Sequence, residues 1–263
     1  MPPAKKRLRS YDPARTRAAV LAQIGNVREA VRALTPAQLA LPTGLGDWTV
    51  RELVAHLAMG VGSVKSSFEQ PVPAGPALVL PEWPFATAAY AGAISGDVEA
   101  LAASAPPAEL FERAAEGIAA LLAGEPGDRL MAIRLGPMGL DDFLVTRTVE
   151  LIVHTDDLNR AAGLDIPYDR GALAACTRLL ADALAVKAPG ASTEVRIPPY
   201  AVVQCVAGPR HTRGTPPNVV ETDPLTWLRL ATGRTTWAEA IGTARVGASG
   251  ERADLSALLP LMG

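Results

Sequence analysis

The sequence has few of the residues that build disulfide frameworks, thiolate metal sites and membrane spans. It contains only two cysteines, Cys176 and Cys205, which excludes a disulfide framework and a cysteine-rich zinc site. No uninterrupted apolar stretch approaches about 18 residues, as a membrane span would need, and the basic amino terminus lacks a signal-peptide pattern. A net charge of -2 gives no reason to expect a polyanion as partner. We expect a soluble cytoplasmic protein with a small-molecule substrate or apolar ligand, no nucleic acid and no integral membrane association.

Helical periodicity dominates the first two thirds of the chain. Apolar residues recur there at three- and four-residue steps, which is typical of amphipathic helices. Thr49 and Glu52 form a capping box at the start of one helix. The strongest patterns predict a bundle of four main helices, at residues 12–34, from 49 onward, 107–122 and 139–162. Five prolines in residues 71–84 predict a long connection, followed by shorter helices at 83–93 and 97–103.

The pattern changes after one more helix at about 169–186. Residues 194–206 alternate in the way of a strand but contain Pro198 and Pro199. Weaker patterns predict a strand at Val219 and Val220, a helix from Pro224, a strand at 244–246 and a final helix at 254–261. The fold class is therefore α+β. The predicted divisions are a disordered basic tail at 1–11, a helical bundle at 12–165, a bridging helix at 166–190 and a small α+β domain at 191–263.

Histidine is also scarce, with three in the chain, and two of them suggest a metal site. Glu150 and His154 stand four residues apart in the helix predicted at 139–162, so their side chains leave the same face. His56 lies on the inward side of the helix that begins near residue 49. If these helices pack side by side, two imidazoles and one carboxylate converge. That set suits a divalent ion such as zinc, with one position left for water or substrate.

Two further polar residues extend this stripe, and a simpler interpretation exists. Arg147 and Asp157 lie one step before and after the predicted ligands. The alternative is that Glu150 and His154 form a solvent-facing pair, while His56 is a core histidine bonded to a backbone carbonyl. Spacing alone leaves both interpretations open.

Two segments resemble the motifs of a known family. They are GDWTVRELVAHL at residues 46–57 and RTVELIVHTDDL at 147–158. Both resemble motifs of the mycothiol-dependent maleylpyruvate isomerase family, whose amino-terminal domain is a DinB-like four-helix bundle. The resemblance spans about residues 12–165. It implies that His56, Glu150 and His154 bind zinc.

The same resemblance suggests roles for two neighbours of the ligands. Asp157 would accept a hydrogen bond from one of the metal ligands or act as a structural cap. Arg147 would anchor an anion, such as part of the thiol cofactor. A structural ion pair remains the alternative for both residues.

The end of the chain resembles a second type of domain. The segment that begins DPLTWLRLATGR at residue 223 is similar to the bacterial sterol-carrier-protein-like domain that follows this bundle in many actinobacterial proteins. In the isomerases such a domain supplies an arginine to the metal site. Arg234 is the best match for this catalytic arginine, and Arg229 and Arg245 are alternatives; a cation that complements a helix end is the simpler role for Arg234.

Two functions from different classes follow. One is a divalent-metal enzyme that uses mycothiol, with the metal activating the thiol for attack on a small electrophilic substrate, as an isomerase or transferase. The other is a carrier of lipid or other apolar molecules with a structural metal site. Cys176 and Cys205 are expected to be core residues, and His211 a solvent-exposed loop residue; the alternative is that His211, with Arg210 and Arg213, contacts an anionic thiol cofactor. We expect a monomer or small homo-oligomer.

Overall fold

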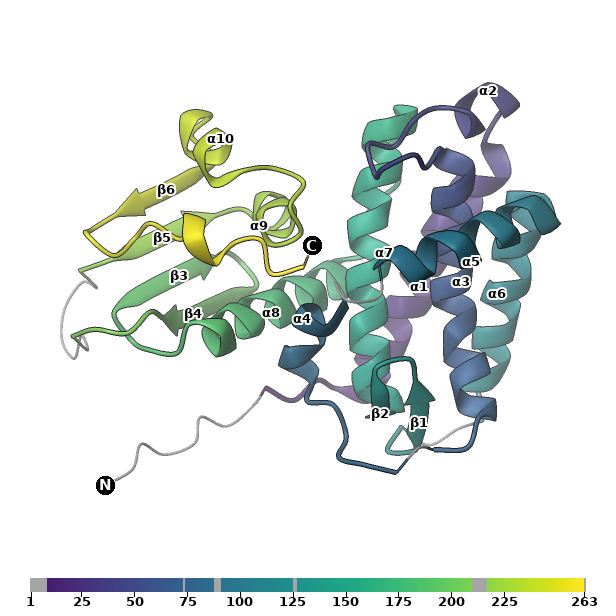
Figure 1. Ribbon diagram of the computed structural model, residues 1–263, viewed down its shortest axis with the longest axis horizontal. Helices are drawn as coiled ribbons and strands as arrows, with labels where there is room; N and C mark the ends of the chain where they lie inside the picture. The colour runs from purple at the N-terminus through teal and green to yellow at the C-terminus, as the bar shows by residue number, and fades with distance from the viewer. Residues whose placement is uncertain (1–8, 73, 88–90, 125–126, 210–216, 263) are drawn as a thin grey trace.

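A computed structural model of the chain describes residues 9–72, 74–87, 91–124, 127–209 and 217–262. A helical domain comes first, and a small α+β domain follows it (Figure 1). The predicted fold class is thus confirmed. None of the described helices is long and apolar enough to cross a membrane.

Four long helices build the amino-terminal bundle. They are α1 (Pro13–Ala33), α3 (Val50–Glu69), α6 (Pro107–Leu122) and α7 (Leu140–Ala162). The capping box predicted at the start of α3 is present, because Thr49 and Glu52 each bond to the other's backbone. Helix α7 packs against both α1 and α3 and is buried around most of its circumference, which explains why its apolar residues form more than one stripe.

Shorter elements surround the bundle. They are α2 (Pro36–Leu39), the 3-10 turn η1 (Leu80–Glu82), α4 (Trp83–Thr87), α5 (Ala91–Ser104) and a hairpin of β1 (Leu130–Ile133) with β2 (Gly136–Gly139). The helix predicted at 83–93 spans α4 and the start of α5, with residues 88–90 outside the described part of the chain. The one predicted at 97–103 is longer in the structure, since α5 already includes Ala91. The hairpin had not been predicted. Its strands are only four residues long, and one consists largely of glycine and proline, which are weak strand formers.

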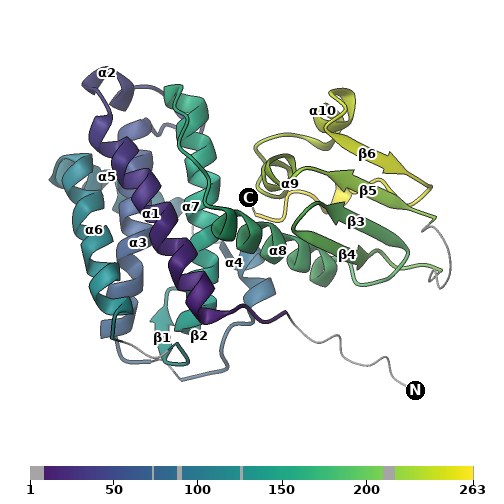
Figure 2. The same ribbon diagram turned by 180° about the vertical axis from the view of Figure 1, so that it is seen from behind.

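Helix α8 (Arg170–Lys187) connects the two domains. It contacts α1 and α7 on the bundle side and β4 on the other side (Figures 1 and 2). The sheet has the order β4 (Ala201–Cys205), β3 (Thr193–Ile197), β5 (Val219–Thr222), β6 (Val246–Ser249). β3 is antiparallel to β4 and parallel to β5, which is antiparallel to β6. One cluster of buried apolar residues runs through both domains. The proposed division within residues 166–190 stays a prediction.

The carboxyl-terminal predictions need three corrections. The strand predicted at 194–206 is two strands, because Pro198 and Pro199 occupy the turn between β3 and β4. The strand predicted at 244–246 begins only at Val246, since Ala244 has a positive φ of 54°. The final helix predicted at 254–261 is wrong: a single 3-10 turn at Ser256–Leu258 is present, because Pro260 disfavours a helical conformation at the residue before it.

The last domain carries two short helices, α9 (Pro224–Ala231) and α10 (Trp237–Gly242). Asp223 caps α9 by accepting from the backbone N–H groups of Leu225 and Thr226. Helix α9 lies at the end of this domain that faces α7 (Figures 1 and 2). This placement brings the arginines of α9 and the turn after it against the helix that carries two of the predicted metal ligands.

Candidate metal centre

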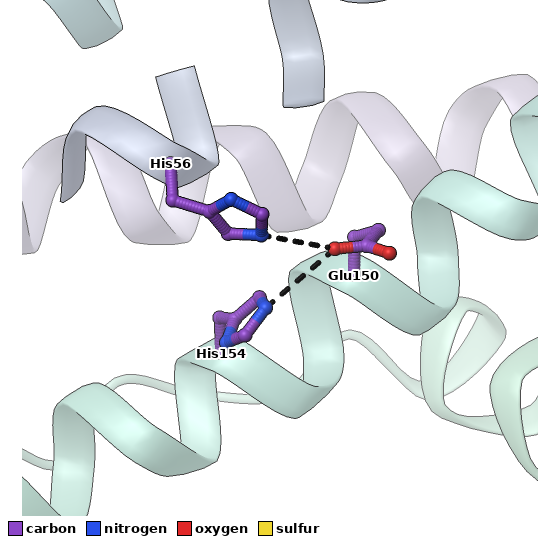
Figure 3. A group of neighbouring side chains, drawn as sticks. All are labelled: His56, Glu150 and His154. Atoms are coloured by element: carbon purple, nitrogen blue, oxygen red, sulfur yellow. Dashed lines mark hydrogen bonds and ion pairs between the residues drawn. The ribbon is translucent and has the colours of Figure 1, made fainter. Parts of the chain in front are cut away.

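The structure brings the three predicted ligands together. His56 projects from α3, and Glu150 and His154 project from successive turns of α7, so that the three side chains point toward one another (Figure 3). Glu150 Oε2 lies 3.3 Å from His56 Nε2 and 3.5 Å from His154 Nε2. One ligand atom from each residue lies within 4.8 Å of the other two. The packing therefore supports the interpretation in which His56 and His154 point into the bundle toward Glu150.

This donor set fits a divalent ion. Ligand atoms about 2.1 Å from a tetrahedral ion lie about 3.4 Å from one another, which is close to both distances from Glu150. Two imidazoles and one carboxylate also match the ligand types of catalytic zinc sites, which keep a position open. The residues therefore fit a metal, while the donor set by itself does not select zinc over nickel or iron.

The electrostatics of the cluster favour an ionised carboxylate. Burial would raise the pKa of Glu150, but hydrogen bonds from His154 and His56 outweigh it and hold that pKa well below its usual value. Burial lowers the pKa of His56 below the ordinary histidine value, which keeps its imidazole neutral near pH 7. A neutral imidazole and an ionised carboxylate are the forms that bind metal.

Asp157 sets the orientation of His154. Burial would lower the pKa of His154, but the hydrogen bond to Asp157, together with Glu150, raises it. His154 Nδ1 lies 2.9 Å from Asp157 Oδ2, so the N–H at Nδ1 donates to this carboxylate and Nε2 is left facing Glu150. A carboxylate behind a metal-binding histidine fixes its tautomer and ring orientation in this way. His56 differs, because its buried Nδ1 has no hydrogen-bond partner among the described residues.

Arg234 contacts Asp157 and not the ligand atoms. Its Nη2 donates to Asp157 Oδ2 at 2.8 Å and its Nε to Oδ1 at 3.2 Å, so the guanidinium and the carboxylate form a bidentate ion pair. Arg160, from the same helix as Asp157, also donates to Oδ1. The structure thus connects the predicted catalytic arginine to His154 through Asp157, and not directly to the proposed metal.

A large cavity opens beside the cluster. It has a volume of about 540 Å³ and is lined by His56, Glu150 and Arg147, together with apolar and aromatic side chains such as Trp83, Phe143 and Ile133. Arg147 is 8% exposed, and no ion pair among the described residues includes it. Its guanidinium instead bonds to Gly60 O and Thr146 Oγ1 and lies over the Phe143 ring. Burial lowers the pKa of Arg147, although a guanidinium remains charged near pH 7.

Comparisons with known proteins identify the family of the bundle that carries this site. Residues 20–159, more than half of the chain, match the profile of the mycothiol maleylpyruvate isomerase N-terminal domain. The chain belongs to the mycothiol-dependent maleylpyruvate isomerase family. Residues 169–261 match the profile of a bacterial SCP ortholog, so the family member has both domains that the sequence motifs indicated. No protein of curated function matches this chain in sequence.

Two solved structures share the fold of this family member. They are a mycothiol-dependent maleylpyruvate isomerase and a histidine-to-alanine mutant of it. Each is 14% identical to this chain, with a TM-score of 0.60, and the match covers 93% of this chain and 95% of the other. The likeness therefore extends over both domains.

One pair beside the site escaped the sequence analysis. Asp156, 1% exposed, accepts from Arg229 Nε at 2.9 Å and from Arg229 Nη2 at 2.7 Å. Arg160 and Tyr168 complete its contacts. The signal was the Asp156–Asp157 doublet in a helix that is otherwise apolar on most sides, because buried neighbouring carboxylates require cationic partners.

The remaining candidate residues lie elsewhere. Arg245 is exposed just before β6. Cys176 and Cys205 are both buried, as predicted for core residues, and burial raises the pKa of the Cys176 thiol, so it supplies no thiolate. His211 lies outside the described residues, as does most of the predicted basic tail.

Proposed function

We propose that this family member is a metal-dependent enzyme that uses mycothiol, of the maleylpyruvate isomerase type, with zinc held by His56, Glu150 and His154. The observation that carries the proposal is the convergence of these three ligand atoms beside a cavity of about 540 Å³, whose lining includes two of the three residues, His56 and Glu150. A cavity of this size holds a small molecule together with part of a thiol cofactor. We further propose that it works in the cytoplasm, as a monomer or small homo-oligomer.

The residues around the cluster have separable roles in this proposal. When bound, the metal would lower the pKa of a thiol and polarise a carbonyl. Glu150 stays ionised and supplies the negative charge of the ligand set. Asp157 accepts the Nδ1 proton of His154 and keeps the ring in place. The aromatic side chains of Trp83 and Phe143 exclude water from part of the cavity.

Arg147 would select the chemical class of substrate. The guanidinium of Arg147 is 8% exposed, faces a cavity and has no ion-pair partner among the described residues; only the Coulombic attraction of Glu150, without direct contact, offsets its charge. A carboxylate on the substrate or on the thiol cofactor would supply that partner through two parallel hydrogen bonds. We therefore propose an anionic ligand whose reactive carbon is held near His56 and Glu150.

The carrier hypothesis is not favoured. The cavity beside the ligands contains a buried arginine and a carboxylate, which suit a polar ligand. A hollow of about 360 Å³ on the carboxyl-terminal domain is lined partly by Arg196 and Glu221, which do not suit an apolar ligand. The family match adds support for an enzyme.

The experiment is a turnover assay with purified, zinc-loaded protein, mycothiol and maleylpyruvate, followed by the absorbance of the isomerised product. Turnover is expected to need both the thiol and the metal. The Glu150→Gln variant keeps the side-chain shape but removes a metal ligand, so metal content and turnover should fall together. Glu194→Gln, which changes a carboxylate in the sheet domain, is the matched control and should leave both unchanged.

Three outcomes would contradict the proposal. Full turnover by the metal-free protein would exclude a role for the metal. Unchanged metal content in Glu150→Gln would exclude the proposed ligands. A zinc-loaded protein that is inert toward thiols but copurifies with lipid would favour the carrier.

A further inference from the structure

Two adjacent aspartates of α7 join the domains through separate arginines. Asp157 is 0% and Asp156 is 1% exposed. Each carboxylate accepts two hydrogen bonds, from the Nε and Nη2 atoms of one arginine of the carboxyl-terminal domain. Arg234 holds Asp157, and Arg229 holds Asp156. Buried ion pairs of this kind add geometric specificity, because each pair demands one relative placement of its partners.

Only one of the two pairs leads to the metal site. Asp157 Oδ2 accepts both from Arg234 and from His154 Nδ1, so Arg234 is connected to a ligand through a single carboxylate. Asp156 contacts none of the three ligand residues; its partners are Arg229, Arg160 and Tyr168. The Arg229 pair therefore places the domain, while the Arg234 pair reaches the site.

The chain between Arg229 and Arg234 turns so that both side chains point toward α7. Helix α9 ends at Ala231, and Gly233 adopts a left-handed φ of 73°, which turns the chain directly after the helix. The backbone N–H of Arg234 then donates to Arg229 O at 2.7 Å, and Arg234 Nη1 donates to Thr232 O at 2.9 Å. The two guanidinium groups are thus held as one unit against α7.

We propose that the carboxyl-terminal domain is part of the metal site through this unit: Arg234 is a positioning residue that fixes Asp157 and through it His154, and Arg229 keeps the domain docked where Arg234 can do so. Metal retention and domain docking are then coupled. This proposal rests on the metal site of the proposed function, and it assigns to Arg234 an action on the ligand and not on the substrate.

The direct test measures how fast full-length, zinc-loaded protein releases its metal to an excess of a chromogenic chelator. Loss of the partner behind a metal-binding histidine typically weakens metal affinity about 10- to 100-fold. Asp157→Asn should therefore release zinc about 10- to 100-fold faster than the wild type, and Arg234→Ala, which acts through Asp157, about 5- to 10-fold faster. Arg229→Ala should also release it faster, by about 5-fold or more, although Arg229 does not contact Asp157.

Two control variants isolate the inter-domain connection. Arg160→Ala removes a cation from the same carboxylates, but Arg160 belongs to α7 itself, so its effect should be smaller than that of either inter-domain arginine. Arg196→Ala breaks an ion pair with Glu194 inside the sheet domain and should leave release unchanged. In an Asp157→Asn background, Arg234→Ala should add no further acceleration, because the connection is already cut.

A second measurement needs no variant. Coupling is reciprocal, so metal that is held better in the docked state must also stabilise docking. Zinc loading of the wild type should slow amide hydrogen exchange at residues 228–232, which include Arg229 and contain none of the three ligands. This readout keeps the proposal testable if an arginine variant does not fold.

The outcomes separate this proposal from the proposed function. Wild-type protein that holds no zinc would overturn both. If the wild type holds zinc but folded Arg234→Ala and Arg229→Ala release it at the wild-type rate, only the coupling would be overturned. Amide exchange at residues 228–232 that is the same with and without zinc would overturn it as well. If Arg160→Ala and Arg234→Ala accelerate zinc release equally, the loss of any cation next to Asp157 would explain the effect, and the role of the domain would be overturned.

Discussion

Replacing Asp157 by asparagine should destabilise the metal-free protein strongly. Asparagine keeps the shape of the side chain but removes its charge. The change weakens the bonds from His154 and Arg234 and leaves the Arg234 side chain, 17% exposed, without a full counter-ion. Removing one partner of a buried ion pair costs about 3–5 kcal/mol. Because Arg160 is 41% exposed and still reaches water, we expect the lower end, about 3 kcal/mol.

The assay is thermal unfolding of the metal-free protein, followed by circular dichroism. At about 2–4 °C per kcal/mol for a chain of this size, the Tm of Asp157→Asn should fall by about 6–12 °C. Asp182→Asn is the control, because Asp182 pairs with Arg9 nearer the surface, where the two side chains are 20% and 34% exposed. Exposed pairs contribute about 0–1 kcal/mol, so the Tm of the control should change by no more than a few degrees.

The difference in Tm between the wild type and Asp157→Asn should depend on pH in a definite direction. The pKa of Asp157 is lowered in the folded state, so its contribution is present above the unfolded value of about 3.9 and is lost as the pH falls through the folded value. The pKa of His154 is raised, so its contribution is full below about 6.5 and is lost as the pH rises through its folded value. The gap in Tm between wild type and variant should therefore be widest between about pH 4 and 6.5. A gap below about 2 °C at pH 5.5, or one that widens below pH 4, would refute the reasoning.

Three further predictions follow from the same contacts. Arg147→Met should raise the Tm by a few degrees, since it replaces a buried guanidinium that has no ion-pair partner among the described residues by an apolar side chain. It should also abolish the binding of a small dicarboxylate, which we expect calorimetry to detect with the wild type; a fall in Tm would contradict this. Zinc affinity, measured by chelator competition, should fall as the pH drops, because protons compete for His154, whose pKa is raised; a flat profile from pH 8 to 6 would argue against His154 as a ligand. Gly233→Ala should cost about 1–2 kcal/mol, seen as a lower Tm, because φ is 73°; an unchanged Tm would show that the turn relaxes without strain.

Local features of the fold were readable from the sequence. The capping box of Thr49 and Glu52 and the ExxxH spacing of Glu150 and His154 depend on residues three or four positions apart, where helical geometry determines which side chains meet. The meeting of His56 with Glu150 bridges 94 positions, and the family resemblance supplied what periodicity alone left open. The predicted ligands therefore converge, while the metal itself stays a prediction.

Features that depend on the contact between the domains were not readable. Arg229 and Asp156 are 73 positions apart, and Arg234 and Asp157 are 77 apart, so no local pattern relates them. Sequence reasoning found Arg234 only through a resemblance and missed the partner of Arg229. The wrong final helix shows a different limit, because an apolar run with a capping residue resembles a helix unless the effect of Pro260 on its neighbour is given full weight.

The most direct test of the account is a crystal structure of the zinc-loaded protein with anomalous scattering measured at the zinc edge. The account predicts one peak bonded to the Nε2 atoms of His56 and His154 and to a carboxylate oxygen of Glu150, with Asp157 still bonded to His154 Nδ1. A peak at another group of residues, or a loaded protein in which these three side chains hold no metal, would contradict it.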